Sequence, residues 1–170
     1  MKNWIALAAA MILAGCQTTP DAPERATAQL LPTPGNKTFG EATFDQTGPK
    51  VRVTIFVQGL KPGQQHGLHI HEVGDCGNAA ENAKGHFDPL GKPHGAPSGA
   101  ERHAGDLPAL TANKQGRAKV QADVDLITLG SGSANIVGRA LVVHANPDDY
   151  KTQPSGNSGA RIACGVIRPG

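Results

Sequence analysis

The sequence contains few aromatic residues and carries little net charge. Of its 170 residues 4% are Phe, Trp or Tyr, with a single Trp and a single Tyr, and the formal net charge at pH 7 is +2. No stretch gathers Lys and Arg into a basic cluster. Because attraction to nucleic acid depends on such a concentration of positive charge, the composition excludes nucleic acid as a partner.

Long apolar runs and helical patterns are also absent. The apolar run from Ile5 to Leu13 is too short to span a bilayer as a helix, and no later segment is long enough to do so. No useful length of sequence shows the apolar spacing of an amphipathic helix, and no repeat recurs at a fixed period. A chain of 170 residues of this kind is expected to form one domain after its N-terminal segment.

The N-terminal segment has the features of a signal peptide. Lys2 supplies a positive start, the apolar run follows, and small residues precede Cys16 in the sequence Leu-Ala-Gly-Cys. This sequence resembles the lipobox of bacterial lipoproteins, which implies that residues 1–15 are removed and that Cys16 is acylated. By the same resemblance, Gln17 after the cysteine implies the outer membrane rather than retention at the inner membrane. An ordinary secretory signal with an incidental cysteine is the alternative.

The expected localisation is therefore the periplasm, with a lipid anchor at Cys16. Residues 16–26 are polar and contain proline, which predicts a flexible tether, and the domain is expected to span residues 27–170. With Cys16 acylated, Cys76 and Cys164 remain. Two cysteines in an oxidising compartment usually pair, so we expect a disulfide between them, and two free buried thiols are the alternative.

Short apolar runs separated by turn residues predict an antiparallel sandwich or barrel. The residues from Val51 to Val57 alternate between apolar and polar, which is the pattern of a strand with one buried face. Two long segments, 73–108 and 145–158, show no periodicity and are expected to be functional loops. The expected strands lie at or near residues 27–32, 37–46, 51–60, 66–72, 116–124, 134–144 and 159–167.

Six of the seven histidines lie between residues 66 and 106, and a cluster of this kind is a candidate metal site. On a strand, His69 and His71 point to the same face, so one rigid element presents two imidazoles side by side. His66 has the opposite parity and is expected to be a hydrogen-bonding partner rather than a ligand. The remaining candidate ligands are His86, His94, His103, Asp106 and, at the end of a predicted strand, His144.

These seven candidate ligands do not divide evenly between two metals. Three imidazoles and one carboxylate suit a closed tetrahedral zinc site, whereas an all-nitrogen set suits copper. The four loop residues after His71 can fill the zinc set, which leaves only three histidines for a second metal. A shared histidine would resolve the count, because an imidazole ring has two nitrogens.

Several motifs of the chain, taken together and in order, resemble the copper/zinc superoxide dismutases of the bacterial secreted type. The motifs are GLHIHE, GHFDPL, ERHAGDL, GRALVVH and SGARIACGVI, and the resemblance extends from about Thr27 to Pro169. It implies an all-β fold, a Greek-key antiparallel β-sandwich or flattened barrel of about eight strands with two long functional loops. The resemblance also implies that the two sheets pack as a sandwich and that positive charge steers the anionic substrate to the site.

The resemblance also implies a role for each candidate residue. The implied copper ligands are His69, His71, His86 and His144. The implied zinc ligands are His86, His94, His103 and Asp106, with His86 as the bridge. Asp148 is implied to link a copper ligand and a zinc ligand through their outer nitrogens, and Arg161 to guide and hold the anionic substrate. Cys76 and Cys164 match the family disulfide. Lys151 is a further candidate for steering, with an ordinary solvated lysine as the alternative.

The implied activity is dismutation of superoxide to O2 and H2O2 by a redox-cycling copper bridged through a histidine to a structural zinc. One copper and one zinc per subunit are implied, in a monomer or a homodimer. The main alternative is a non-catalytic periplasmic protein that binds or delivers copper or zinc, which is expected to lack a copper ligand or the arginine. A zinc hydrolase would need an open metal position and a nearby base, which the motifs do not clearly offer. Well-spaced ligands argue against an inert immunoglobulin-like sandwich.

Overall fold

The computed structural model describes residues 24–170, which form ten strands and one short 3-10 helix. The strands are β1 (Arg25–Pro32), β2 (Phe39–Thr47), β3 (Lys50–Gln58), β4 (Gln65–His66), β5 (Leu68–His71), β6 (Leu110–Thr111), β7 (Ala118–Val124), β8 (Ala140–His144), β9 (Arg161–Val166) and β10 (Arg168–Pro169), and the 3-10 helix is η1 (Glu81–Ala83). The signal peptide, Cys16 and most of the predicted tether lie outside the described residues. Within residues 24–170 no helix has the length and apolar character needed to cross a membrane.

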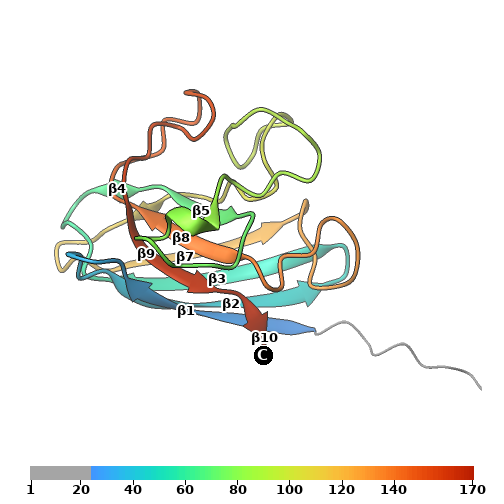
Figure 1. Ribbon diagram of the computed structural model, residues 1–170, viewed down its shortest axis with the longest axis horizontal. Helices are drawn as coiled ribbons and strands as arrows, with labels where there is room; N and C mark the ends of the chain where they lie inside the picture. Colours follow the sequence, from blue (N-terminus) through green and yellow to red (C-terminus); the bar gives the residue numbers. More distant parts are fainter. Residues whose placement is uncertain (1–23) are drawn as a thin grey trace, which may run out of the picture.

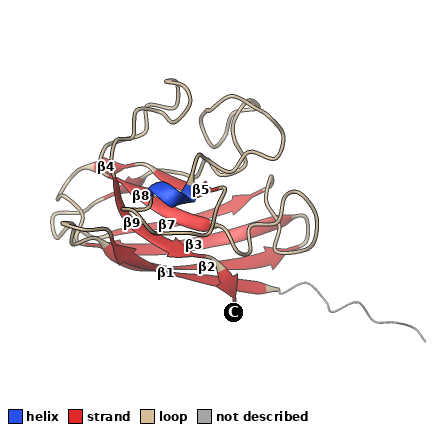
Figure 2. Cartoon of the chain, viewed as in Figure 1, coloured by secondary structure: helices blue, strands red, loops and turns tan. Residues whose placement is uncertain are grey.

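One curled antiparallel sheet makes up most of the fold. Its strands are hydrogen-bonded in the order β5-β8-β9-β1-β2-β3-β7, with β10 beside β1, and β4 and β6 pair separately. β1 pairs with β2 up to Leu30 and with β9 at Leu31 and Pro32, so the sheet bends there. β5, β8 and β9 thereby fold over β1, β2, β3 and β7 (Figure 1), and Figure 2 shows how little of this region is helical. The predicted all-β Greek-key sandwich is confirmed.

The core lies between the two halves of this curled sheet. In β3 every second residue from Val51 to Val57 is at most 1% exposed, which confirms the predicted buried face. These side chains pack in one cluster with Phe44 of β2 and with Leu141 of β8. Burying a side chain of this size stabilises the fold by roughly 1.5–3 kcal/mol, so the cluster holds the two halves together.

The predicted strand from residue 66 to 72 is divided in two at Gly67. Before this point the chain pairs with β6, and after it the chain pairs with β8. A Cβ at Gly67 would lie 2.8 Å from the Cβ of Ser158, so the close approach requires glycine. The expectation of one regular strand is therefore wrong, because the backbone changes partner between His66 and His69.

The predicted strand from residue 134 to 144 is shorter in the structure, where β8 begins at Ala140. The preceding residues form a turn, in which the backbone N–H of Arg139 donates to the carbonyl of Ile136 over 3.1 Å. Gly138 has a φ of 87°, in the left-handed region that favours glycine. The turn ends the extended backbone that the apolar residues suggested.

The first strand begins at Arg25, slightly before the predicted start of the domain at Thr27. Arg25 pairs with Asp45 of β2, and its Nε donates to the Asp45 carboxylate over 2.6 Å. The pairing with β2 thus continues into the segment predicted as tether. No periodic pattern predicts β6, β10 or η1, because elements of two or three residues are too short to show one.

Two long loops rise on the same side of the sheet, at the top of Figure 1. The first joins β5 to β6 over residues 72–109, and the second joins β8 to β9 over residues 145–160, as predicted. A disulfide between Cys76 and Cys164 ties the first loop to β9, which confirms the predicted pair. The bridged residues are 88 positions apart, and chain entropy gives such a bridge roughly 4–5 kcal/mol of stabilisation.

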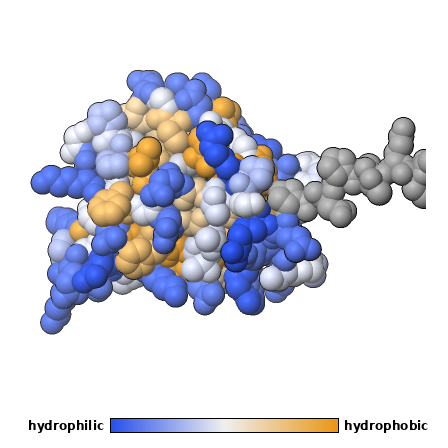
Figure 3. Space-filling view, turned by 90° about the horizontal axis from the view of Figure 1, so that it is seen from below, coloured by the Kyte–Doolittle hydropathy of each residue, from blue (hydrophilic) through white to orange (hydrophobic). Residues whose placement is uncertain are grey.

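Large apolar side chains reach the surface at a few places, and Figure 3 shows hydrophobic side chains near the middle of one face with hydrophilic ones around them. The exposed ones are Leu31, Phe39, Val73 and Leu90. A cavity of about 510 Å³ lies beside the disulfide and is lined in part by Leu31, Cys76 and Val166. None of its lining residues is His, Asp or Glu, so it takes no part in the metal chemistry considered next.

Candidate metal centre

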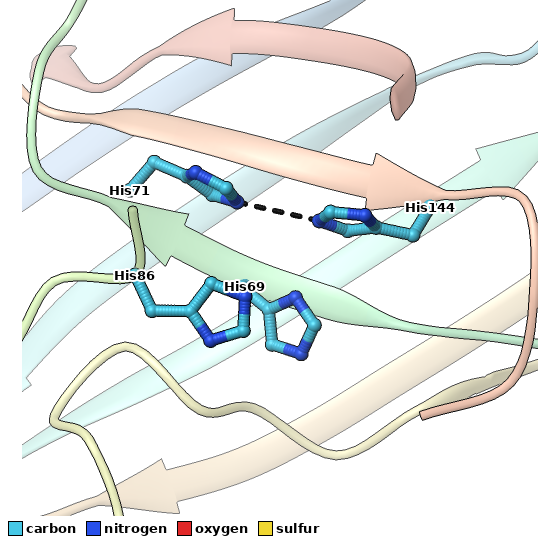
Figure 4. A group of neighbouring side chains, drawn as sticks. All are labelled: His69, His71, His86 and His144. Atoms are coloured by element: carbon cyan, nitrogen blue, oxygen red, sulfur yellow. Dashed lines mark hydrogen bonds between the residues drawn. The ribbon is translucent and has the colours of Figure 1, made fainter. Parts of the chain in front are cut away.

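Two groups of buried side chains share His86. The four-histidine group consists of His69, His71, His86 and His144, and the aspartate group consists of His86, His94, His103 and Asp106. Within each group the potential ligand atoms lie within 4.8 Å of one another. Figure 4 shows the rings of the four-histidine group gathered in one place. The structure thus brings together the two sets that the resemblance implies.

Strands β5 and β8 carry most of the four-histidine group. His69 and His71 are two residues apart on β5, and positions two apart on a strand face the same side. His144 ends the neighbouring strand β8, which pairs antiparallel with β5. The sheet therefore fixes three of the four imidazoles before any loop residue contributes.

The first long loop docks on the edge of β5 through backbone hydrogen bonds. The N–H of Phe87 donates to the carbonyl of Ile70 (2.8 Å), the N–H of Ile70 to that of Gly105 (2.9 Å), and the N–H of Gly105 to that of Phe87 (2.9 Å). A Cβ at Gly105 would lie 2.2 Å from the Ile70 oxygen, so the approach requires glycine. His86 and Asp106 adjoin these bonded residues, so the loop backbone itself sets their positions.

The tautomers of His71 and His144 indicate a cation between them. His71 Nδ1 lies 2.8 Å from the carbonyl of Lys84, and His144 Nδ1 lies 3.0 Å from the carbonyl of Gly159. A carbonyl can only accept, so both Nδ1 atoms carry hydrogen and both Nε2 atoms present lone pairs. The two Nε2 atoms face each other over 3.3 Å, the contact marked in Figure 4. Lone pairs at this distance repel, and a cation bound by both removes the repulsion.

His69 and His86 each direct a further unused nitrogen into the four-histidine group. His69 Nε2 lies 2.6 Å from Asp148 Oδ2, and its Nδ1 is buried with no hydrogen-bond partner among the described residues. His86 Nδ1 lies 2.9 Å from Asp106 Oδ1, and its Nε2 is buried in the same unpartnered way. A buried nitrogen without a partner is costly, and a bound metal removes that cost. A set of four nitrogens suits copper.

Three imidazoles surround one oxygen of Asp106 in the aspartate group. Asp106 Oδ1 lies 2.9 Å from His86 Nδ1, 3.1 Å from His94 Nδ1 and 3.3 Å from His103 Nδ1. Asp106 Oδ2 accepts the backbone N–H groups of Gly95 (3.1 Å) and His103 (2.9 Å), which orients the carboxylate. Three nitrogens and one oxygen fit a tetrahedral zinc ion.

Asp148 joins the two groups from outside. Its Oδ2 contacts His69 Nε2 over 2.6 Å, and its Oδ1 contacts His94 Nε2 over 2.9 Å. The backbone N–H of Tyr150 donates to the same Oδ1 over 2.7 Å. A Cβ at Gly156 would fall 1.8 Å from this oxygen, so a glycine there leaves room for the carboxylate. Carboxylate partners of this kind fix the orientation of ligating imidazoles.

Burial and the carboxylates of Asp106 and Asp148 determine whether the imidazoles carry a charge. Burial lowers the pKa of His71 to about 2, of His144 to about 3 and of His86 to about 4, so these rings are neutral at pH 7. Burial also opposes the charged form of His94, but the two carboxylates that contact its ring raise its pKa to about 9. Without metal, the aspartate group therefore holds a proton on His94 at pH 7.

Arg161 lines a cavity of about 490 Å³ together with three members of the four-histidine group. Its guanidinium donates to the carbonyls of Ala80 and Lys84, the latter over 2.7 Å, and its Nε lies 3.7 Å from Glu81 Oε1. The Lys84 carbonyl also accepts from His71, so the arginine and a candidate ligand share one acceptor. The positive charge of Arg161 is thus fixed in the wall of the cavity that these imidazoles line.

Other predicted residues lie outside the two groups. His66 Nδ1 lies 2.9 Å from the carbonyl of His144, and His66 belongs to neither group. Lys151 is exposed and does not line the cavity. Lys84 and Glu81 do line it, although sequence reasoning did not identify them. The one sequence feature that could have indicated them is their position shortly before His86.

Comparisons with known proteins agree with this geometry. A sequence profile of the family described as "Copper/zinc superoxide dismutase (SODC)" matches residues 38–167. The second Cu-Zn superoxide dismutase of Aquifex aeolicus (strain VF5) is 42% identical over 149 residues, which are 85% of this chain and 86% of that protein. The Cu-Zn superoxide dismutase of Paramecium bursaria Chlorella virus 1 is 41% identical over 134 residues, 75% of this chain and 71% of the viral one.

A solved structure is similar over the same region. The crystal structure of the clock protein EA4 has a TM-score of 0.79 and 36% sequence identity, and the match covers 88% of this chain and 96% of that one. The likeness therefore extends over almost the whole of the described fold.

The exchange His86→Ala should weaken the binding of both metals, because it removes the residue that the two groups share. His66→Ala should leave both metals bound and lower the free energy of unfolding by about 1–3 kcal/mol, the cost of unpairing a buried polar group. Metal content after dialysis against a chelator and denaturant unfolding measure the two effects. Equal metal loss from both variants would refute the assignment of His66 as a hydrogen-bonding partner.

Zinc binding to the metal-free protein should release the proton that His94 holds at pH 7. His94, with its pKa of about 9, must lose a proton to become a ligand, so zinc affinity should rise as pH increases from 6 to 9. Copper binding should show no such rise, because His71, His86 and His144 are already neutral. Calorimetric titration in buffers of different ionisation enthalpy counts the protons. Equal proton release with both metals would contradict this difference between the groups.

Proposed function

The chain belongs to the copper/zinc superoxide dismutase family, and on this premise we propose that the four-histidine group is its copper site and the aspartate group its zinc site. The protein is an enzyme that converts superoxide to O2 and H2O2 and uses copper and zinc as cofactors. The observation that carries the assignment of residues is the convergence of imidazole nitrogens on either side of His86: unpartnered nitrogens of His69 and His86 on one side, and three Nδ1 atoms around Asp106 Oδ1 on the other.

Copper, when bound, supplies the one-electron redox chemistry of the reaction, and zinc supplies a fixed charge without redox change. The chain's residues hold and orient these ions. Asp148 fixes the rings of His69 and His94 through their outer nitrogens. His86 is placed to carry a proton at Nε2, the ring nitrogen that lies beside the cavity-lining imidazoles and has no hydrogen-bond partner among the described residues.

Arg161 is proposed to attract and hold superoxide. The side chain is 15% exposed, and two backbone carbonyls fix its guanidinium in the wall of the cavity. A fixed positive charge in a cavity raises the rate of capture of a small anion, and salt screens this attraction. Glu81, at 3.7 Å from the arginine, partly offsets its charge.

A non-catalytic copper or zinc binding or delivery protein is not favoured. Such a protein is expected to lack a copper ligand or the arginine, whereas all four imidazoles are gathered here and three of them line one cavity with Arg161. A zinc hydrolase is not favoured either, because the aspartate group already offers a complete set of four ligands.

We further propose that the enzyme is of the secreted bacterial type and is anchored by lipid at Cys16 to the periplasmic side of the outer membrane. The Leu-Ala-Gly-Cys sequence and Gln17 support the anchor. The Cys76–Cys164 disulfide supports an oxidising compartment. The described domain begins beside β10, away from the raised parts of the two loops at the top of Figure 1, so an anchor at its start would leave the cavity lined by Arg161 accessible.

The purified domain should contain about one copper and one zinc per chain and consume superoxide. Selective removal of copper should abolish this activity, and addition of copper should restore it, because only copper supplies redox chemistry. Metal analysis and a superoxide-consumption assay before and after copper removal measure this. Bound metal without dismutation would instead favour the binding or delivery protein.

Replacement of Arg161 by alanine should leave both metals bound but lower the rate and flatten its dependence on salt. The reason is that the variant loses the fixed charge of the cavity without losing a ligand. The control is Arg168→Ala, which removes an exposed arginine from β10. Rate constants over a range of ionic strength give the readout, and an unchanged rate at low salt would remove Arg161 from the mechanism.

The exchange Cys16→Ser in the full chain should move the protein from the membrane fraction to the soluble fraction of a Gram-negative host. Gln17→Asp should keep it in the membrane fraction but shift it to the inner membrane. Fractionation on a density gradient and labelling with palmitate measure both effects. A Cys16→Ser protein that stays with the membrane would argue for an ordinary secretory signal with an incidental cysteine.

A further inference from the structure

Gln153 joins the second long loop to the first through the backbone of His94. Its Oε1 accepts the N–H of His94 over 2.8 Å, and its Nε2 donates to the carbonyl of His94 over 2.9 Å. The same Nε2 lies 3.3 Å from the carbonyl of Lys151. One side-chain amide thus pairs with both backbone groups of a single residue, as a neighbouring strand would.

His94 has no regular secondary structure to hold it. It lies in the irregular part of the 72–109 loop, yet its side chain is fully buried. The ring is held at two points, by Asp106 at Nδ1 (3.1 Å) and by Asp148 at Nε2 (2.9 Å). The two bonds from Gln153 fix the backbone from which this ring projects. Together the four contacts define both the position of His94 and the direction of its Nδ1.

We propose that Gln153 is a positioning residue that holds the zinc ligand His94 ready for zinc and thereby sets zinc affinity. The inference rests on the assignment of the aspartate group to zinc. The side-chain amide both accepts and donates here, whereas a carboxylate cannot donate to the His94 carbonyl and leucine can do neither. Outer partners of this kind tune metal affinity through the ligand that they orient.

Zinc affinity of Gln153→Leu should fall about tenfold, the factor that two partly solvated hydrogen bonds account for. Copper affinity, measured on zinc-saturated protein, should not change, since His94 is not in the four-histidine group. Competition with a chromophoric chelator measures both affinities. Cobalt bound in place of zinc should show an altered visible spectrum in the variant, because the spectrum reports the geometry of the ligands.

Two control variants separate positioning from general weakening. Gln115→Leu changes an exposed glutamine in a turn, whose side chain has no hydrogen bond within residues 24–170, and it should bind zinc as the unchanged protein does. Ser158→Ala removes the bond from Ser158 Oγ to the Ser155 carbonyl within the same loop but makes no change at His94. It should keep the zinc affinity of the unchanged protein. Thermal unfolding of the metal-free Gln153→Leu protein checks that it folds, and Gln153→Ala repeats the test if it does not.

Wild-type zinc affinity in the Gln153 variants, or an equal loss in Ser158→Ala, would overturn the inference and leave the proposed function standing. If the unchanged protein itself binds no zinc, the proposed function and this inference fail together. A tenfold loss confined to the Gln153 variants, with the altered cobalt spectrum, supports the assignment.

Discussion

The packing of imidazole nitrogens against one another in a buried space is the constraint on which the rest of the structure depends. His71 and His144 turn lone pairs toward each other over 3.3 Å, and His86 presents one nitrogen to each of the two groups. Polar groups in this arrangement are costly without cations. The surrounding backbone allows this close packing, because Gly67, Gly105 and Gly156 leave room where a side chain would collide with its neighbours.

The two metal sites depend on different parts of the fold. Three members of the four-histidine group lie on two paired strands, whose backbone hydrogen bonds form without any metal. The aspartate group draws on the 72–109 loop, which lacks regular structure apart from η1. Backbone hydrogen bonds to β5, the disulfide and the contacts with the second loop hold this loop, and zinc would add to them when bound. His86 and Asp148 couple the two sites, and the segment that the disulfide anchors also supplies the carbonyls that hold Arg161. Substrate capture and metal binding therefore share one framework.

The sequence predicted those features that short-range patterns encode. The alternation in β3 and the spacing of His69 and His71 follow from the period of a strand, and the motifs around the ligands identified both sets. The division at Gly67, the turn before β8 and the clasp of His94 by Gln153 could not be predicted in this way. The division at Gly67 and the contacts of Gln153 with His94 arise where segments distant in sequence meet. The turn before β8 is local, but it is held by a hydrogen bond from the N–H of Gly138 to the distant carbonyl of Ile167. Lys84 and Glu81 were missed for the same reason, because only the folded loop places them beside Arg161.

A crystal structure of the protein loaded with copper and zinc, with anomalous scattering recorded at both absorption edges, tests the central claim most directly. The account predicts two metal peaks on opposite sides of the His86 ring, copper among the nitrogens of the four-histidine group and zinc beside Asp106. A metal peak away from these groups, or a His86 ring that contacts only one metal, would contradict it.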